Sequence, residues 1–256
     1  MTPSPQRTEK RQKTRAPPSS SYQSAWYTRQ LVVRPILVAI DGPSGAGKGT
    51  IARALADALG FRHIDSGAMY RAVGWKALRD GLALTDEAAV GAVAEQSAIE
   101  VDGSSVQIDG VDVSQAIRTP AIDKAATAVA RLPKVREALV ARLRVAGAGG
   151  GVIMEGRDIG TVVFPAADVK FYLDADAGER ARRRAQDPAH TGTTSVAEVA
   201  YALGERDKSD RTRTISPLTA AADACVIDTT GRPIAEVVDE ALQIVRAWLG
   251  GSELEQ

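Results

Sequence analysis

Short apolar runs alternate with segments of helical periodicity from residue 36 onward. Five runs of four or five residues predict buried strands at residues 36–40, 61–64, 151–154, 169–173 and 224–227. Apolar residues at 51, 54, 55, 58 and 59 recur on one helical face, and Gly60 is a stop signal. The same spacing returns over residues 234–249. Strands that alternate with helices predict an α/β fold, with a five-stranded, mostly parallel sheet flanked by helices.

The pattern changes between residues 97 and 114. The dipeptides Asp102-Gly103 and Asp109-Gly110 separate short alternating segments, which is typical of antiparallel strands joined by tight turns. A helical pattern follows over residues 133–146, and a glycine-rich stretch from Gly147 to Gly151 leads back to the main sheet. We therefore expect a small lobe, residues 95–147 approximately, inserted into the sheet domain.

Charge is distributed unevenly along the 256 residues, although 32 basic residues balance 32 acidic ones. Residues 1–34 hold seven basic residues and one acidic residue, a net charge of +6, so residues 35–256 carry −6. Residues 1–25 contain no Val, Ile, Leu or Phe and cannot offset the entropy of ordering by burial, so a disordered basic tail is predicted for 1–34. A transit peptide or a nucleic-acid-binding arm remains open beside the simpler interpretation of an unstructured extension. A flexible C-terminus is predicted for residues 250–256.

Composition excludes several classes of protein. No run of about 18 apolar residues is present, so no membrane span is predicted. The balanced net charge argues against a stable nucleic-acid partner. The single cysteine, Cys225, cannot form an intramolecular disulfide and is expected to be a small core residue. Of the two histidines, His63 lies in a predicted strand and is interpreted as structural.

The strongest local signal is a glycine-rich loop between the first strand and the first helix. It matches G-x-x-x-x-G-K, with the hydroxyl residue displaced by one position, and comprises Gly42, Pro43, Ser44, Gly45, Ala46, Gly47, Lys48, Gly49 and Thr50. Glycines allow backbone amides to surround phosphate oxygens, and the helix N-terminus and Lys48 add positive charge. The loop predicts binding of a nucleoside triphosphate. GTPase motifs of the D-x-x-G and N-K-x-D type are not evident.

Two further motifs follow predicted strands. Asp65-Ser-Gly, with Arg71 in the next helix, can clamp a small anion, although such a motif is also a common helix cap. Glu155-Gly-Arg-Asp158 follows a strand at the sheet edge where ligands bind in parallel sheets. Here Glu155 is placed to help hold Mg²⁺, with Thr50, and Arg157 to neutralise an acceptor phosphate. A surface Arg–Asp pair is the alternative.

Arginines also gather in the C-terminal half of the chain. Arg206, Asp210 and Arg213 are spaced to share one helical face, which fits a ligand face as well as a solvated one. The arginine-rich segment 179–184 runs into a segment rich in small and polar residues, a pattern typical of a lid that closes over phosphates, predicted for residues 180–195 approximately. A charged surface helix followed by an ordinary loop would give the same sequence pattern.

Taken together, these motifs resemble the bacterial cytidylate (CMP) kinase family over residues 36–249. The resemblance rests on segments 40–50, 65–71, 135–139, 156–165 and 205–213, in family order and spacing. It implies a P-loop kinase fold and a nucleoside monophosphate kinase domain at 35–249, with an inserted NMP-binding lobe and a lid. It also implies ATP-dependent, Mg²⁺-dependent phosphorylation of CMP and dCMP, in pyrimidine nucleotide metabolism, by a monomer. A cytoplasmic location is expected because no targeting signal and no disulfide are evident.

The resemblance assigns roles to individual residues. Those that would contact the cytosine ring are Ser66, Arg136, Asp158 and Arg213. The ribose would be held by Thr127, Arg206 and Asp210, and the acceptor phosphate by Arg71 and Arg157. Lys48, Arg157, Arg184 and Arg211 would neutralise the transferring phosphoryl group. Glu155 stands where relatives often have Asp, one methylene shorter. UMP, AMP or a non-nucleotide alcohol remains an alternative acceptor, and a P-loop protein that binds nucleotide without transfer is a second alternative.

Overall fold

A computed structural model describes residues 35–187 and 195–252. The predicted tail, part of the predicted lid at 188–194 and the last four residues lie outside the described residues. Within the described segments, no helix is both long enough and apolar enough to cross a membrane.

A parallel sheet of five strands, in the order β2-β6-β1-β7-β8, forms the centre of the domain. The strands are β1 (Leu37–Asp41), β2 (Arg62–Asp65), β6 (Val152–Glu155), β7 (Val169–Asp174) and β8 (Cys225–Asp228). The prediction of a five-stranded parallel sheet is confirmed. Each strand extends one residue further than its apolar run and ends on an acidic residue at the carboxyl edge of the sheet.

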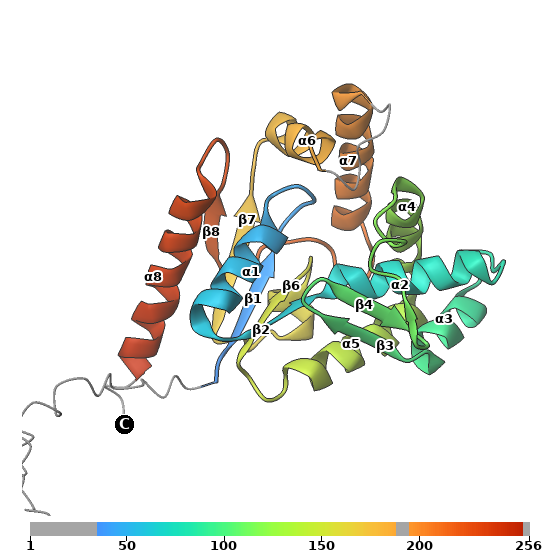
Figure 1. The fold of residues 1–256 in the computed structure, drawn as a ribbon, viewed down its shortest axis with the longest axis horizontal. Helices are drawn as coiled ribbons and strands as arrows, with labels where there is room; N and C mark the ends of the chain where they lie inside the picture. Colours follow the sequence, from blue (N-terminus) through green and yellow to red (C-terminus); the bar gives the residue numbers. More distant parts are fainter. Residues whose placement is uncertain (1–34, 188–194, 253–256) are drawn as a thin grey trace, which may run out of the picture. The chain divides into compact units, whose positions relative to one another are not determined.

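Helices cover both faces of this sheet, as Figure 1 shows. Alternate residues of β1 point to opposite faces, as the two-residue period of a strand requires. Val38 and Ile40 pack with α1 (Lys48–Leu59) and α8 (Ile234–Ser252). Leu37 and Ala39 pack with α2 (Ser66–Arg79), α3 (Glu87–Gln96) and α5 (Pro133–Gly147). Both faces are therefore buried, which explains the continuous apolar runs in the sequence.

A second, antiparallel sheet is formed by β3 (Ile99–Asp102), β4 (Ser105–Ile108) and β5 (Val111–Asp112). Its turns are at Gly103 and Asp109-Gly110, where the backbone has positive φ, as the turn dipeptides predict. Helix α4 (Pro120–Val129) follows, capped by the Thr119 hydroxyl. Apolar residues of the small sheet pack against α2 and α4 in a cluster of their own.

Helices α6 (Ala177–Ala185) and α7 (Val196–Arg211) stand together beyond the carboxyl ends of the central strands (Figure 1). Helix α7 ends at Arg211 and is followed by Thr212 as its C-cap. The prediction that Arg206, Asp210 and Arg213 share one helical face is therefore wrong for Arg213, because the chain turns out of the helix before it.

Strand β8 lies at the edge of the central sheet, beside β7 alone among the described strands. Cys225 begins this strand and is exposed, so its expected place in the core is wrong. Of the four residues of β8, only Ile227 is buried. Cover of the sheet faces is thus incomplete at this edge, in contrast to the other edge strand, β2, where His63 and Ile64 are buried.

Candidate active site

The glycine-rich loop joins β1 to α1 in a conformation that requires glycine. Gly42, Gly45 and Gly47 have φ values of 146°, 83° and 89°. A Cβ on Gly42 would lie 2.0 Å from the carbonyl oxygen of Leu173 in β7. The loop is thus pressed against the sheet, and its backbone amides precede the N-terminus of α1, a site suited to phosphate.

Lys48 is the first residue of α1, and its Nζ donates to the carbonyl oxygen of Pro43 at 2.8 Å. Its side chain is buried in the loop. Burial and the nearby charge of Arg157 lower the pKa of Lys48 to about 7, although Glu155 and Asp41 act in the opposite direction. The ammonium thus lacks a sufficient counter-charge, which a bound phosphate would supply.

Arg180 links the loop to α6 and α7. Its guanidinium donates to the carbonyl oxygens of Ala175 and Ser44, each at 3.0 Å, and to the carboxylate of Asp207 on α7. The close approach explains Gly45, where a Cβ would lie 2.9 Å from the Cβ of Arg180. Arg180 was not predicted as a site residue; its position within the arginine-rich segment was the only signal in the sequence.

A cavity of about 700 Å³ opens between the loop, α2, α4, α6 and α7. It is lined by residues 44–50, by Glu155 and Arg184, and by all nine residues that the resemblance implies for CMP: Ser66, Arg71, Thr127, Arg136, Arg157, Asp158, Arg206, Asp210 and Arg213. Arg211 does not line it; its side chain lies beside Tyr172. This volume lies within the range of pockets that bind small molecules and cofactors.

A buried Arg–Asp pair lies on the wall of the cavity. Arg136 on α5 donates to Asp158, and its guanidinium lies 5.8 Å from the centre of the Tyr70 ring. Arg213 donates to the carbonyl oxygen of Ser216 at 2.8 Å and lies 4.0 Å from Asp210. Arg136, Arg206 and Arg213 each have one buried nitrogen without a hydrogen-bond partner in the described structure. Each of these nitrogens can donate to a ligand in the cavity.

Comparison with known proteins decides the family. The family model described as cytidylate kinase matches residues 38–247. The chain belongs to the cytidylate kinase family. A cytidylate kinase of Desulfitobacterium hafniense (strain Y51) is 47% identical over 211 residues, which cover 81% of this chain and 91% of the relative. One of Solibacter usitatus (strain Ellin6076) is 47% identical over 215 residues, 83% of this chain and 93% of the relative. One of Nocardia farcinica (strain IFM 10152) is 45% identical over 217 residues, with coverages of 82% and 94%.

Membership of the cytidylate kinase family confirms the predicted P-loop kinase fold and the prediction of a phosphotransferase.

Asp41, for which no role was predicted, stabilises the segment that follows Arg157 and Asp158. Its two oxygens accept the backbone N–H groups of Ile159, at 2.8 Å, and Gly160, at 2.7 Å. These bonds hold the single turn of π-helix at Ile159–Val163, which follows Arg157 and Asp158 directly. Burial raises the pKa of Asp41 to about 6 despite the two backbone bonds.

Glu155 and His63 form a second buried pair in this cytidylate kinase family member. The Nε2 of His63, in the middle of β2, lies 2.9 Å from Oε1 of Glu155, at the carboxyl end of the neighbouring strand β6. His63 was interpreted as structural, and it contacts the very carboxylate predicted to face Mg²⁺. Glu155 also lies beside Gly49 of the loop, where a Cβ would be 3.1 Å from its Oε1. No group of three or more His, Cys, Asp or Glu side chains with a metal-binding arrangement occurs among the described residues.

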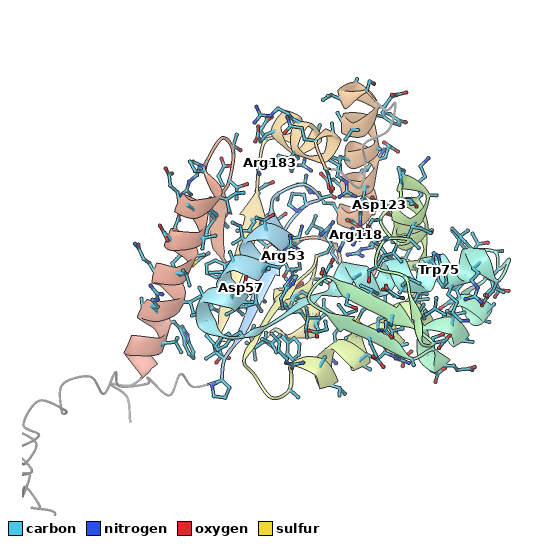
Figure 2. All side chains as sticks on the ribbon, viewed as in Figure 1. Arg53, Asp57, Trp75, Arg118, Asp123 and Arg183 are labelled. Atoms are coloured by element: carbon cyan, nitrogen blue, oxygen red, sulfur yellow. The ribbon has the colours of Figure 1, made fainter. Side chains whose placement is uncertain are left out.

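Two more arginines that line the cavity, Arg183 and Arg118, were not predicted as site residues. Arg183 donates to the hydroxyl and carbonyl oxygens of Thr229, at 3.0 and 2.6 Å, and its Nη1 would lie 3.9 Å from a Cβ on Gly47 (Figure 2). Arg118 lines the cavity from the side of the small sheet. The pKa of Asp65 is lowered against the effect of burial, mainly by Arg71 and least by Arg118. The first could have been found within the arginine-rich segment; the second stands in a stretch that the sequence analysis left unassigned.

Proposed function

We propose that this chain transfers the γ-phosphoryl group of ATP to CMP and dCMP, which yields ADP and the pyrimidine nucleoside diphosphate. One observation carries the proposal: the triphosphate loop and all nine residues implied for the acceptor line the same cavity. Two anionic substrates that enter from the two sides of one cavity can meet in line for transfer.

The wall around Asp158 supports a cytosine-specific site. Cytosine presents an N4 amino donor beside acceptor atoms, and carboxylates commonly accept from that amino group. The buried Arg136–Asp158 pair offers a carboxylate acceptor beside guanidinium donors, and Arg136 and Arg213 each have an unused donor. Uracil carries an oxygen in place of the amino group, which would face the carboxylate and be repelled. Asp158 would therefore discriminate CMP from UMP.

The transfer step needs no covalent intermediate on the protein. An oxygen of the acceptor phosphate attacks the γ-phosphorus, and the bond between that phosphorus and the β,γ-bridging oxygen breaks, so ADP leaves with the electron pair. Lys48, Arg157 and Arg184 line the cavity and would neutralise charge on the moving group. Arg71 would hold the acceptor phosphate in line. A cavity closed by α6 and α7 would also exclude water and limit ATP hydrolysis.

The residues present fit a magnesium ion. Mg²⁺ prefers oxygen ligands and is commonly held by one or two carboxylates together with substrate phosphates. The carboxylate of Glu155 and the hydroxyl of Thr50 both line the cavity beside the loop, and would hold the ion. When bound, Mg²⁺ supplies charge neutralisation between the phosphates of ATP. His63 would orient Glu155 through its 2.9 Å contact.

A panel of acceptors tests the proposal. The chain is incubated with Mg²⁺, ATP and, separately, CMP, dCMP, UMP, AMP and a non-nucleotide alcohol, and ADP release is followed. CMP and dCMP should give the highest kcat/KM, and a preference for AMP would contradict the assignment. Lys48→Ala, with folding checked by circular dichroism, should abolish transfer. If activity survived this substitution, the assumed role of the loop would be wrong.

The remaining expectations are also open to measurement. The division into a core, an inserted NMP-binding lobe and a lid would be tested by comparing hydrogen exchange with and without both nucleotides. Light scattering would test the monomer, and fractionation of cells would test the cytoplasmic location.

A further inference from the structure

Asp123, on the first turn of α4, gathers arginines from three other helices. Its Oδ1 accepts from Nε of Arg71 on α2 at 3.0 Å and from Nη1 of Arg206 on α7 at 3.3 Å. Its Oδ2 accepts from Nη2 of Arg184 on α6. Figure 2 shows Asp123 between α4 and the base of α7. One carboxylate thus joins elements that are separated by 52 to 83 residues in the chain.

These arginines need a counter-charge before any substrate arrives. Arg71, Arg184 and Arg206 are each less than a fifth exposed, so water screens their mutual repulsion poorly. Burial, together with the charges of Arg157 and Arg71, lowers the pKa of Arg206 to about 10, and Asp123 acts in the opposite direction. Asp65, Asp187 and Asp210 act on Arg71, Arg184 and Arg206 respectively, but Asp123 contacts all three.

The contacts of Asp123 leave the arginines available to a ligand. Arg71, Arg184 and Arg206 all line the cavity, whereas Asp123 is not among its lining residues. Asp123 bonds to Nε of Arg71, and Nη1 of that guanidinium lies 3.7 Å from Oδ2 of Asp65, which itself lines the cavity. Nε of Arg206 is buried without a partner. The carboxylate therefore contacts the arginines from outside the cavity lining and does not occupy the place of the substrate.

We propose that Asp123 is a positioning residue, which holds Arg71 and Arg206 for the acceptor nucleotide and Arg184 for the transferring phosphoryl group. This inference rests on the proposed function for the roles of the three arginines. Charge-assisted hydrogen bonds of this kind fix both distance and orientation. Because phosphoryl transfer depends almost wholly on positioning and charge, small displacements of these groups are costly.

Four variants test the inference in the full chain: Asp123→Asn, Asp123→Glu, Arg184→Met and the double variant Asp123→Asn/Arg184→Met. Asp239→Asn on α8 is the matched control, since Asp239 is exposed and does not line the cavity. For each chain, kcat and KM are measured for CMP and for ATP, and thermal melting reports folding.

Asp123→Asn should lower kcat/KM for CMP at least tenfold and change the KM for ATP less than twofold. Asp123→Glu, which keeps the charge, should recover part of the loss. In the Arg184→Met background, Asp123→Asn should cost clearly less in kcat, because one of its partners is already gone. Asp239→Asn should behave as wild type. A lower KM for CMP in Asp123→Asn would overturn the inference, because the carboxylate would then compete with the substrate. Equal costs in both backgrounds would also overturn it.

A binding measurement separates this inference from the proposed function. If the wild type does not phosphorylate CMP, the proposed function fails, whatever the variants do. Inorganic phosphate binding to the substrate-free chains, measured by calorimetry, still tests the positioning role. Asp123→Asn should bind phosphate several-fold more weakly than the wild type and the Asp239→Asn control, and equal or tighter binding would contradict the role of Asp123.

Discussion

Lys48 provides a direct test of how the loop binds ATP. Its pKa of about 7 in the substrate-free chain follows from burial and the nearby charge of Arg157. Phosphate oxygens around the amine would favour its charged form, so ATP binding should be linked to proton uptake. At pH 8 about 10% of the free chain carries a protonated Lys48, so binding should take up about 0.9 proton per ATP. At pH 6 the uptake should fall to about 0.1.

The same linkage sets the pH dependence of affinity. Only the protonated form binds tightly, so the dissociation constant for ATP should rise about fivefold from pH 7 to pH 8 and about tenfold from pH 8 to pH 9. The stability of the free chain should depend on the charge of Lys48 in the opposite way: ATP affinity falls as pH rises, and folding stability increases. Between about 7 and 10.5 the unfolded chain holds more protons on this lysine than the folded one, so Lys48 makes the free energy of unfolding rise with pH over that window.

The assay is titration calorimetry of ATP with excess Mg²⁺ and no acceptor, in two buffers of different ionisation enthalpy. At pH 8 the phosphates of ATP are fully ionised, so proton uptake reports the protein. Lys48→Arg is the matched control, because a guanidinium keeps its charge and does not titrate here. Uptake should therefore vanish in that variant. Uptake below about 0.3 proton in the wild type, or equal uptake in both chains, would refute the link between burial of Lys48 and its pKa.

Three further predictions concern separate parts of the domain. Arg213→Met should raise the KM for CMP more than tenfold and the KM for ATP less than threefold, and equal losses in steady-state kinetics would argue against its place beside the base. Asp41 has a raised pKa, so its stabilising effect is present below pH 3.8 and is lost as pH rises through about 6. Wild type compared with Asp41→Asn should therefore lose about 3 kcal/mol of unfolding free energy over that range in urea denaturation, and a constant difference would contradict the raised pKa. Cys225→Ser should keep full activity, and a maleimide should label wild-type Cys225 rapidly under native conditions, because the side chain is exposed; slow labelling would place it in the core.

The central sheet was readable from the sequence because burial on both faces makes a strand almost wholly apolar. The ends were predicted one residue early because each strand ends on an acidic residue: Asp41, Asp65, Glu155, Asp174 and Asp228. Apolar pattern alone assigns such residues to loops. In the structure they remain in the hydrogen-bonded ladder, and their carboxylates face partners at the sheet edge, as Asp41 does with Ile159 and Gly160.

Helices α3 and α4 were missed for a different reason. Their buried faces hold few large apolar residues, with alanine or glycine at four of the seven buried positions, and their segments are short. Cap signals were nevertheless present. Asp86 accepts the N–H groups of Ala88 and Ala89 in α3, and Thr119 with Pro120 begins α4, an arrangement that favours a helix start. Capping residues were therefore the better guide here than periodicity.

The arginine-rich motifs predicted which residues would meet but not what holds them. Arg157 pairs with Asp210, Arg180 with Asp207, and Arg184 with Asp123, and each pair joins segments at least 27 residues apart. No local pattern indicates such pairings, because tertiary packing creates them. Asp123, four residues before the predicted Thr127, would have been recognisable only if α4 itself had been predicted.

Positive charge is concentrated at the cavity, although the domain as a whole is negative. Residues 35–256 carry a net charge of −6, yet the described residues that line the cavity include twelve basic and six acidic side chains. The cavity is thus +6 within a negative domain, and the rest of that domain carries −12. Field lines from such an arrangement concentrate in the concave region, where they attract phosphate-bearing ligands and steer them away from the outer surface. The carboxylates within the cavity limit the repulsion among its arginines, so the positive site can be assembled before ATP and CMP arrive.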